Sequence, residues 1–384
     1  MKKLAILPVL LTSMASAASL NGFDIQGYGF IKASSMYADR ALASYNNINL
    51  SAPTHAVAET RGIERTSRMS FQTAQSRLGM NLKKGDALSS KIEFDFIDFN
   101  KSSPTTQMLP RVRIASVTYA WDNKKVVVGQ DWDLFSPVTS YTFDYVGLYF
   151  QAGNTGFMRQ QAQYLESYGD YEWGAALGMA GNNPGVSDAN LETAKSPSYA
   201  FRLSKKIENG RMGLSSIYAR LKYEQPTENG TSHDSYGFNS FYEQTMGSVA
   251  IKSEIYVGQN MNNIGTLAIG KGTQNSNVKE IGGTLTGSYK IADQKTIFGG
   301  VGLAKVTNPK DMTAFAPNPS TGAAITAPGI KSNFLTRVGF EYKVTEDLSW
   351  LSELSRYETL TKLGATSNQL NIAHSVETGV QLRF

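Results

Sequence analysis

The chain of 384 residues contains no cysteine and only three histidines, His55, His233 and His374. Without cysteine, a disulfide framework, a thiolate zinc centre, an iron–sulfur cluster and a cysteine nucleophile are all excluded. The histidines are too far apart for a local metal motif such as H-E-x-x-H, although this spacing does not exclude a site assembled in the fold. We therefore expect no metal site and no cofactor. We also expect no enzymatic activity, since His374 shares the parity of the outward Val376 and the other two histidines lie in or beside long loops.

A strong excess of charge of one sign is missing as well. Lysine and arginine total 37, aspartate and glutamate total 32, and the formal net charge is +5. A nucleic-acid-binding groove needs clustered basic residues on a strongly basic face. This balance predicts no nucleic-acid partner.

Long apolar runs are missing after residue 17, where none approaches the roughly 20 residues that a membrane helix needs. The first 17 residues have the pattern of a secretory signal peptide: Lys2 and Lys3, the short apolar run Leu4–Leu11, and an A-x-A cleavage site ending at Ala17. We expect a mature chain of residues 18–384 that is exported. Such a chain is either soluble or embedded in a membrane through strands.

The mature chain is rich in runs of about 10 to 14 residues in which every second residue is apolar. Short polar turns and long loops alternate between these runs, whereas a soluble sandwich has no reason to make every second loop long. We predict an all-β fold, a 16-stranded antiparallel transmembrane β-barrel with short periplasmic turns and long extracellular loops. The expected strands are 22–37, 71–83, 89–100, 110–121, 125–133, 157–167, 171–180, 197–207, 211–223, 233–243, 248–258, 279–291, 295–306, 332–344, 348–360 and 372–384.

The two faces of these runs differ in polarity. In the last run, Val376, Val380 and Leu382 share one face, while Glu377 and Gln381 share the other. Ionic residues on an inner face need a water-filled lumen or a satisfied interior network. Aromatic residues next to the short turns suit an interfacial girdle, the alternative being core aromatics of a soluble β-protein. The predicted girdle is Trp121, Trp173, Tyr289, Tyr342, Trp350 and Phe384.

Four segments carry a resemblance to a known family. Ser76–Gly79, Lys91–Phe96, Leu109–Tyr119 and Val128–Phe135 resemble the DcaP-type porins, and the alternating strand that ends in Phe384 resembles the terminal assembly signal of outer-membrane proteins. The resemblance implies a trimeric diffusion channel in the outer membrane that prefers small anions such as dicarboxylic acids. It also implies that the barrel-assembly machinery recognises the last strand. A coiled-coil segment often found before the barrel in this family is missing here, so trimerisation would rest on the barrel walls.

The loop expected after the fifth strand, residues 134–156, is the candidate constriction. Its aromatic side chains would favour aggregation if the loop extended into water, so we predict that it folds inward and narrows the lumen. An extracellular cap or a contact between subunits is the alternative. The candidate constriction residues are Tyr141, Phe143, Asp144 and Tyr145.

An anion path needs basic side chains on inward-facing positions, and arginine suits carboxylates because its guanidinium binds them bidentately. Strand parity nominates Arg77, Arg159, Arg202, Lys252 and Arg337. Arg111 and Arg113 match the family's basic motif, but their parity conflicts with that of Tyr119 and Trp121. Either a β-bulge turns these two arginines inward, or they face a neighbouring subunit. The competing interpretation for all seven is a ladder of arginine–carboxylate pairs that stabilises the wall.

One other interpretation of the strand pattern remains open. A closed barrel that serves as an adhesin or structural tether would share every strand feature above.

The segment Gly265–Gly272 spells G-x-x-x-x-G-K but ends in Gly272 where a phosphate-binding loop has Ser or Thr, and no strand–helix context surrounds it. We expect this segment to be a flexible external loop.

Overall fold

The computed structural model describes residues 18–44, 53–59, 62–97, 109–145, 148–180, 192–194, 196–223, 232–272, 276–309, 329–363 and 367–384. The predicted signal peptide, residues 1–17, lies outside these residues, so its cleavage stays a prediction.

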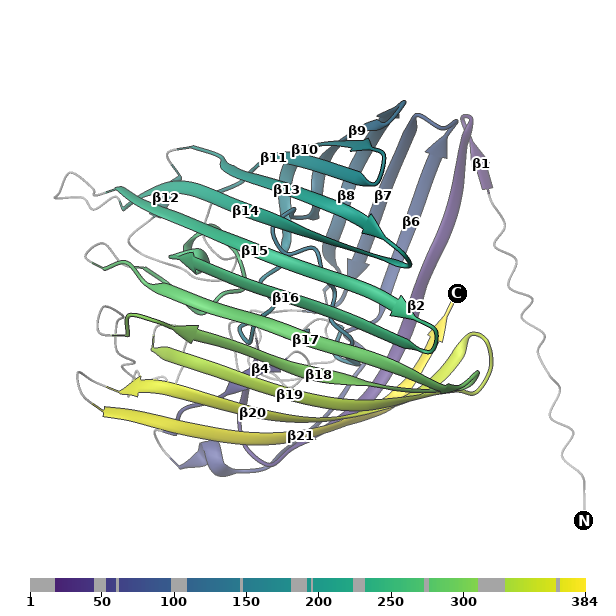
Figure 1. Ribbon diagram of the computed structural model, residues 1–384. Coiled ribbons are helices and arrows are strands. Elements are labelled where there is room, and N and C mark those ends of the chain that lie inside the picture. Colours follow the sequence, from purple (N-terminus) through teal and green to yellow (C-terminus); the bar gives the residue numbers. More distant parts are fainter. Residues whose placement is uncertain are drawn as a thin grey trace, which may run out of the picture.

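The described strands form one closed antiparallel barrel (Figure 1). Its sheet has 19 strands, but β1 (Ala18–Leu20) is a short addition, and β5/β6 and β12/β13 are each two halves of one wall strand, which leaves sixteen. The predicted 16-stranded antiparallel barrel is therefore confirmed. The wall strands are β2 (Phe23–Ala38), β5 (Arg68–Gln72) with β6 (Arg77–Lys84), β7 (Leu88–Asp95), β8 (Arg111–Trp121), β9 (Lys124–Trp132), β10 (Met158–Tyr168), β11 (Tyr171–Gly178), β12 (Glu192–Ala194) with β13 (Ser198–Ile207), β14 (Gly210–Tyr223), β15 (Ser232–Met246), β16 (Val249–Gln259), β17 (Lys279–Ala292), β18 (Lys295–Val306), β19 (Ile330–Lys343), β20 (Leu348–Leu363) and β21 (Ser367–Arg383).

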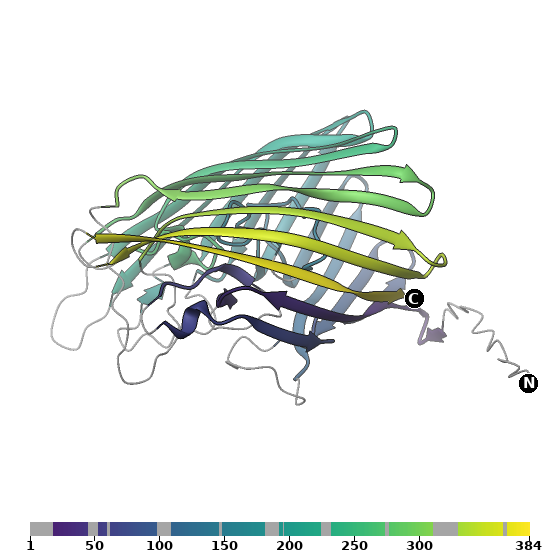
Figure 2. The same ribbon diagram turned by 90° about the horizontal axis from the view of Figure 1, so that it is seen from below.

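The barrel closes where β2 pairs with β21 (Figure 2). The register runs from Phe30 opposite Arg383 to Ala38 opposite Ser375. Inside this seam, the Ser34 hydroxyl donates to Glu377 Oε1 at 2.7 Å, across 343 positions of sequence. Closure leaves no open edge among the described wall strands, as a barrel in lipid requires.

Apolar and polar side chains alternate along each strand, so that the two kinds lie on opposite faces of the wall. On β20, Leu354 is 51% exposed on the outside, while its neighbours Glu353 and Ser355 are 3% exposed inside. An apolar outer face and a polar inner face are typical of transmembrane barrels. No helix among the described residues is long and apolar enough to cross a membrane.

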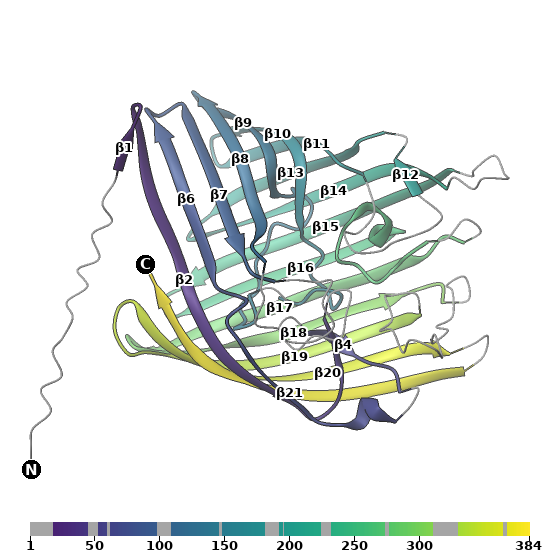
Figure 3. The ribbon, with the colours of Figure 1, turned by 180° about the vertical axis from the view of Figure 1, so that it is seen from behind.

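Three features depart from the expected strand plan. The second wall strand is interrupted at residues 73–76, where Gln75 turns inward and is fully buried. The connection from β2 to β5 contains a hairpin, β3 (Leu42–Ser44) with β4 (Pro53–Ala56), and a short 3-10 helix η1 (Ile63–Arg65). A second 3-10 helix, η2 (Met261–Ile264), follows β16. Figure 3 shows β4 within the outline of the barrel.

Candidate functional site

Between β9 and β10, the described residues 133–145 and 148–157, here named the inner loop, lie inside the barrel. Its apolar side chains are withdrawn from water, with Phe135, Phe143 and Tyr149 fully buried and Leu134 2% exposed. Phe135 packs with Ile217 of β14 and Tyr256 of β16, and Tyr149 packs with Leu335 of β19. Burial of these groups removes the apolar area that would otherwise face water, which is why the segment folds inward.

Wall side chains hold this inner loop through its backbone. Glu254 of β16 accepts a hydrogen bond from the Val138 amide at 3.0 Å, and Glu353 of β20 accepts one from the Phe143 amide at 2.9 Å. On β19, Asn333 donates to the Gln151 carbonyl at 2.8 Å. These inward-facing polar residues therefore position the loop and satisfy buried backbone groups that would otherwise lack partners.

Glycines in the wall let the loop backbone approach closely. A Cβ on Gly302 of β18 would overlap the carbonyl oxygen of Ala152, and a Cβ on Gly153 would overlap the carbonyl oxygen of Gly283 of β17. Gly153 also has φ +109°, a left-handed conformation that favours glycine. Glycine inside a strand often marks the close approach of another backbone. That signal was present in the sequence and our reading of the sequence missed it.

The β3–β4 hairpin covers the inner loop. Leu42 and Ala56 pack in one buried cluster with Tyr149 and Ala152, and the Ala56 amide donates to Thr359 Oγ1 of β20 at 3.1 Å. Beside Ala56, burial lowers the pKa of His55 to about 4, although a hydrogen bond with Gln151 opposes the shift. His55 is therefore a neutral imidazole packed against the loop.

The segment after β16 is a second inward segment. Leu267 and Ala268 are fully buried, the Gln151 amide donates to the Leu267 carbonyl at 2.9 Å, and the Leu267 amide donates to the Thr155 carbonyl at 3.1 Å. The expectation that Gly265–Gly272 is a flexible external loop is wrong. Its apolar residues complete a core with Leu148 and Phe150 of the inner loop.

The four candidate constriction residues all contact the wall. Tyr141 lies under the Lys252 ammonium, whose Nζ is 4.4 Å from the ring centre. The Phe143 carbonyl accepts from Lys32 Nζ at 2.6 Å, and Asp144 Oδ1 accepts from Gln75 at 2.8 Å. Tyr145 donates its hydroxyl to Gln381 at 2.7 Å. The loop thus crosses the interior, and its role in narrowing a lumen stays a prediction.

Arg111 and Arg113 both turn inward because the β7–β8 pairing contains a register shift between Glu93 and Phe94. The guanidinium of Arg111 binds Asp95 bidentately, at 2.9 and 2.6 Å, and Arg113 binds Glu93 at 2.8 Å. The β-bulge alternative is therefore the one that the structure shows. Both arginines sit in wall ion pairs.

Three of the other predicted basic residues also have partners, in the wall or in the inner loop. Arg337 is within 3.3 Å of Asp144 and 3.5 Å of Glu353. Arg159 donates to the Met179 carbonyl at 2.5 Å, and Arg77 donates to the Tyr145 carbonyl at 2.7 Å. Arg337 therefore matches the ladder interpretation through its carboxylate partners, whereas Arg77 holds the backbone of the inner loop.

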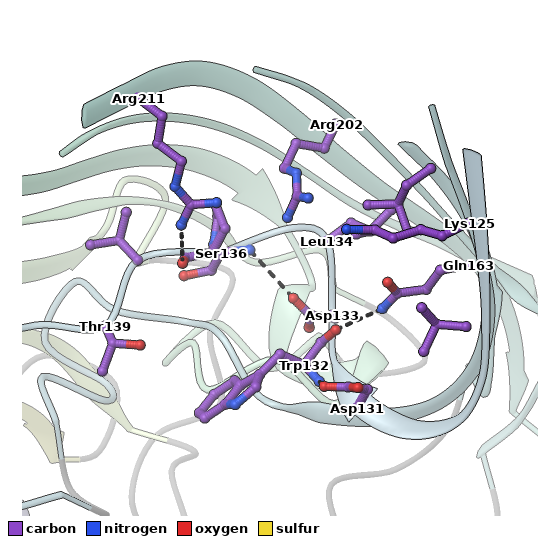
Figure 4. Close-up of a pocket in the computed structure, with 14 residues that line it drawn as sticks. Lys125, Asp131, Trp132, Asp133, Leu134, Ser136, Thr139, Gln163, Arg202 and Arg211 are labelled. Carbon is purple, nitrogen blue, oxygen red and sulfur yellow. Dashed lines mark hydrogen bonds between the residues drawn. The ribbon is translucent and has the colours of Figure 1, made fainter. Parts of the chain in front are cut away.

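Arg202 and Lys252 instead line hollow parts of the interior. A cavity of about 290 Å³ lies between the inner loop and the wall, where Lys125, Arg202 and Arg211 face Asp131 and Asp133 (Figure 4). A second cavity of about 560 Å³, lined by Lys206, Glu243 and Lys252, shares Arg211 with the first.

The sequence did not predict Lys125 and Arg211 as inward-facing residues. Both lie at strand ends beside short turns, where alternation along the strand is least reliable for assigning a side chain to a face. Arg211 binds Glu243 at 2.6 Å and donates to the Pro137 carbonyl at 3.0 Å. Arg202 binds Glu172 at 2.8 Å, and Lys125 lies 3.6 Å from the same carboxylate. The cavities therefore have a basic wall whose charges are only partly balanced.

Aromatic side chains do gather at the short-turn end. The rings of Trp121 and Tyr164 are 6.3 Å apart, and those of Tyr164 and Trp173 are 5.2 Å apart. Trp350 packs on Phe340 at 6.1 Å and donates to Thr378. Tyr289 and Phe384 are exposed, and Tyr342 is half-buried. Contact of these residues with lipid stays a prediction.

Several solved structures share the fold of this barrel. The outer-membrane channel DcaP of Acinetobacter baumannii superposes with a TM-score of 0.74 at 14% identity, covering 95% of this chain and 99% of that one. The chain has the porin fold. An anion-selective porin from Comamonas acidovorans gives a TM-score of 0.56 at 11% identity, over 94% of this chain and 100% of that one.

A trimer form of OmpT, an outer-membrane protein of Vibrio cholerae, also shares the porin fold, with a TM-score of 0.53 at 13% identity over 95% of this chain and 100% of that chain. No protein-family model matches the sequence, and no curated protein matches it. The resemblance to DcaP-type porins is thus confirmed for the fold. At these sequence identities, a shared porin fold does not establish a shared activity.

Proposed function

We propose that this porin-fold protein is an outer-membrane channel for passive diffusion of small hydrophilic solutes, with a preference for small anions such as dicarboxylates. The observation that carries the proposal is the basic wall of the two cavities beside the inner loop. Their lining includes five cationic residues against three acidic ones. The cationic residues are Lys125, Arg202, Lys206, Arg211 and Lys252, and the acidic ones are Asp131, Asp133 and Glu243.

The chemistry of these residues fits a carboxylate solute. A positive potential in a cleft with low-dielectric walls attracts anions and raises their local concentration. Arginine can exchange one carboxylate partner for another without losing its bidentate geometry. A passing dicarboxylate would compete with Glu172 for Arg202 and with Glu243 for Arg211, and would bind weakly enough to leave.

We also propose a homotrimer in the outer membrane lipid, with the short turns on the periplasmic side and with assembly through the last strand by the barrel-assembly machinery. The trimer form reported for the Vibrio cholerae protein supports this assembly. The exposed apolar outer face, exemplified by Leu214, Ile255 and Leu354, supports the location in lipid.

A closed barrel with an adhesive or structural role is the second candidate. It is favoured by one observation: among the described residues, the inner loop, the β3–β4 hairpin and the η2 segment pack together through fully buried Leu42, Tyr149 and Leu267. Such packing fills much of the interior toward the long loops.

The test is conductance of the purified protein in a planar bilayer, with the reversal potential measured across a potassium chloride gradient and again with succinate present. We expect discrete channels, a reversal potential of the sign for anions, and a lower chloride current in succinate. Silence would support the closed barrel. Open channels with cation selectivity would overturn the anion path while leaving the diffusion channel intact.

A further inference from the structure

Four charged residues form one row across the neighbouring strands β13, β14, β15 and β16. Lys206 is the cross-strand partner of Arg211, and Arg211 is the partner of Glu243. Glu243 is in turn the partner of Lys252. Residues directly opposite each other on adjacent strands have Cβ atoms about 4.5–5.5 Å apart. All four, here named the charged row, line the cavity of about 560 Å³ beside the inner loop.

The order of the charges in this row is specific. Glu243 lies between two cations, Arg211 on one neighbouring strand and Lys252 on the other. It forms an ion pair with Arg211 at 2.6 Å. Among the residues that the structure describes, Lys252 forms no ion pair and instead donates to the Thr139 carbonyl at 2.9 Å. The middle of the charged row therefore presents a cation, a carboxylate and a second cation in sequence.

Each of these three side chains keeps capacity for a further partner. Arg211 donates through Nε to Glu243 Oε2 and through Nη2 to the Pro137 carbonyl of the inner loop (Figure 4). Within the described part of the chain, no partner occupies Arg211 Nη1 or Glu243 Oε1. The Lys252 ammonium has three donors and uses one of them on the loop. The inner loop thus holds both cations in place while their remaining donors stay available to a solute.

An anion that binds Arg211 competes with Glu243 for the guanidinium. A plain dicarboxylate that displaced Glu243 would leave this carboxylate without its cation and beside a second negative charge, which disfavours binding. A solute that carries an ammonium group of its own supplies a new partner for Glu243. The charge order of the row is therefore complementary to a solute with an ammonium group between two carboxylates.

We propose that the charged row is a binding subsite for acidic amino acids such as glutamate. The two carboxylates of the solute bind Arg211 and Lys252, and its ammonium group binds Glu243 between them. The Tyr141 ring, 4.4 Å from Lys252 Nζ, helps to orient this lysine toward the solute. The inference rests on the proposed channel function and names a solute class within the small anions.

The test compares three solutes that differ at one group: L-glutamate, glutarate, which lacks the ammonium group, and N-acetyl-L-glutamate, in which it is blocked. Saturation-transfer NMR on the purified protein in detergent micelles measures their binding without need of an open channel. L-glutamate should bind about tenfold more tightly than either of the other two, the size of one hydrogen bond to a charged group.

Substitutions in the charged row should separate the two kinds of contact. Glu243→Gln should abolish the preference for L-glutamate and should not weaken glutarate, because it removes the partner of the ammonium group and a repulsive charge. Lys252→Gln should weaken L-glutamate and glutarate by a similar factor. The matched control is Glu341→Gln on β19, since Glu341 is 17% exposed against 19% for Glu243 and also pairs with an arginine, Arg383, outside this cavity. The control should keep the wild-type preference.

Equal binding of the three solutes by the wild type would overturn the proposal and would leave Glu243 as the neutralising partner of Arg211. A preference that survives Glu243→Gln, or one that is lost equally in Glu341→Gln, would overturn it as well. Bilayer conductance separates this result from the channel function. Open channels without a glutamate preference contradict the subsite alone, whereas a silent barrel that prefers glutamate contradicts the channel and retains the subsite.

Discussion

Arg337 and Asp144 meet at 3.3 Å in the interior of the barrel, and neither side chain is more than 1% exposed. Arg337 also donates to Thr142 Oγ1 at 2.6 Å and lies 3.5 Å from Glu353. Its guanidinium stands between the rings of Tyr149 and Tyr357, at 5.3 and 6.0 Å. One wall arginine therefore links the inner loop to two neighbouring strands through charge and ring contacts.

Replacing Arg337 with methionine should destabilise the barrel by about 3–5 kcal/mol, because Asp144 and Glu353 would remain buried without their cation. The free energy of unfolding in lipid micelles is the measurement. The control is Arg356→Met, which removes an ion pair whose side chains are 49% and 29% exposed. That change should cost less than about 1 kcal/mol. Equal losses in both variants would contradict the central role of Arg337.

Replacing Gly302 with alanine should displace the inner loop, because the new Cβ would overlap the carbonyl oxygen of Ala152. Overpacking of this kind costs about 1–3 kcal/mol. Thermal unfolding and single-channel current noise are the measurements, with lower stability and more noise expected. Gly27→Ala is the control, since a Cβ there meets nothing within 4 Å. A quiet, fully stable Gly302→Ala channel would show that the loop does not need this approach.

Arg211 and Glu243 form an ion pair at 2.6 Å on the lining of the larger cavity. Substitution of one or the other should shift the ion selectivity in opposite directions. Arg211→Gln should lower the anion preference, and Glu243→Gln should raise it, because each removes one charge of known sign from the same place. Reversal potentials in a salt gradient measure both. No shift in either variant would mean that ions do not pass this cavity.

Docking of the β3–β4 hairpin should weaken in acid because of His55. Burial holds the His55 pKa near 4, below its ordinary 6.5, so the docked hairpin keeps a neutral imidazole while the undocked hairpin takes up a proton. The contribution of His55 is therefore fully present above pH 6.5 and declines toward pH 4, by up to about 1.4 kcal/mol per pH unit.

Hydrogen exchange of the residue 54–57 amides at neutral pH and near pH 4.5 measures this effect when it is expressed as protection relative to the intrinsic exchange rate at each pH, with lower protection expected in acid. The His55→Gln variant should lose the pH dependence. The exposed His374, which contacts Asp39, is the matched control, and the His374→Gln variant should retain the pH dependence. Wild-type protection that is equal at both pH values would contradict the role of His55.

The wall of this barrel could be predicted from sequence because its strands follow a strict period of two. The expected range 295–306 coincides with β18, and 197–207 differs from β13 by one residue. The interruption at residues 73–76 could not be predicted in this way. Gln75 turns inward there to accept from Lys32 Nζ at 2.7 Å and to donate to Asp144, and both partners are remote in sequence.

The interior was harder to predict than the wall. Aromatic content indicated that residues 134–156 would be buried, but the covering hairpin around Leu42 and Ala56 has no signal of comparable strength. Inward positions were predicted from alternation for five of the seven basic residues, whereas Arg111 and Arg113 came from the family motif and needed a bulge to turn inward. Their partners, such as Asp95 for Arg111, are set by register across strands, which a single sequence does not specify.

The β2–β21 seam makes the barrel depend on its most distant segments. A chain that lacked β21 would leave one edge of β2 and one edge of β20 without partners, because β21 pairs with both of those edges. Two open edges in hydrocarbon are costly. Insertion of this protein is therefore expected to be a single terminal event, in which the wall remains an open, curled sheet until one last pairing of remote segments turns it into a cylinder.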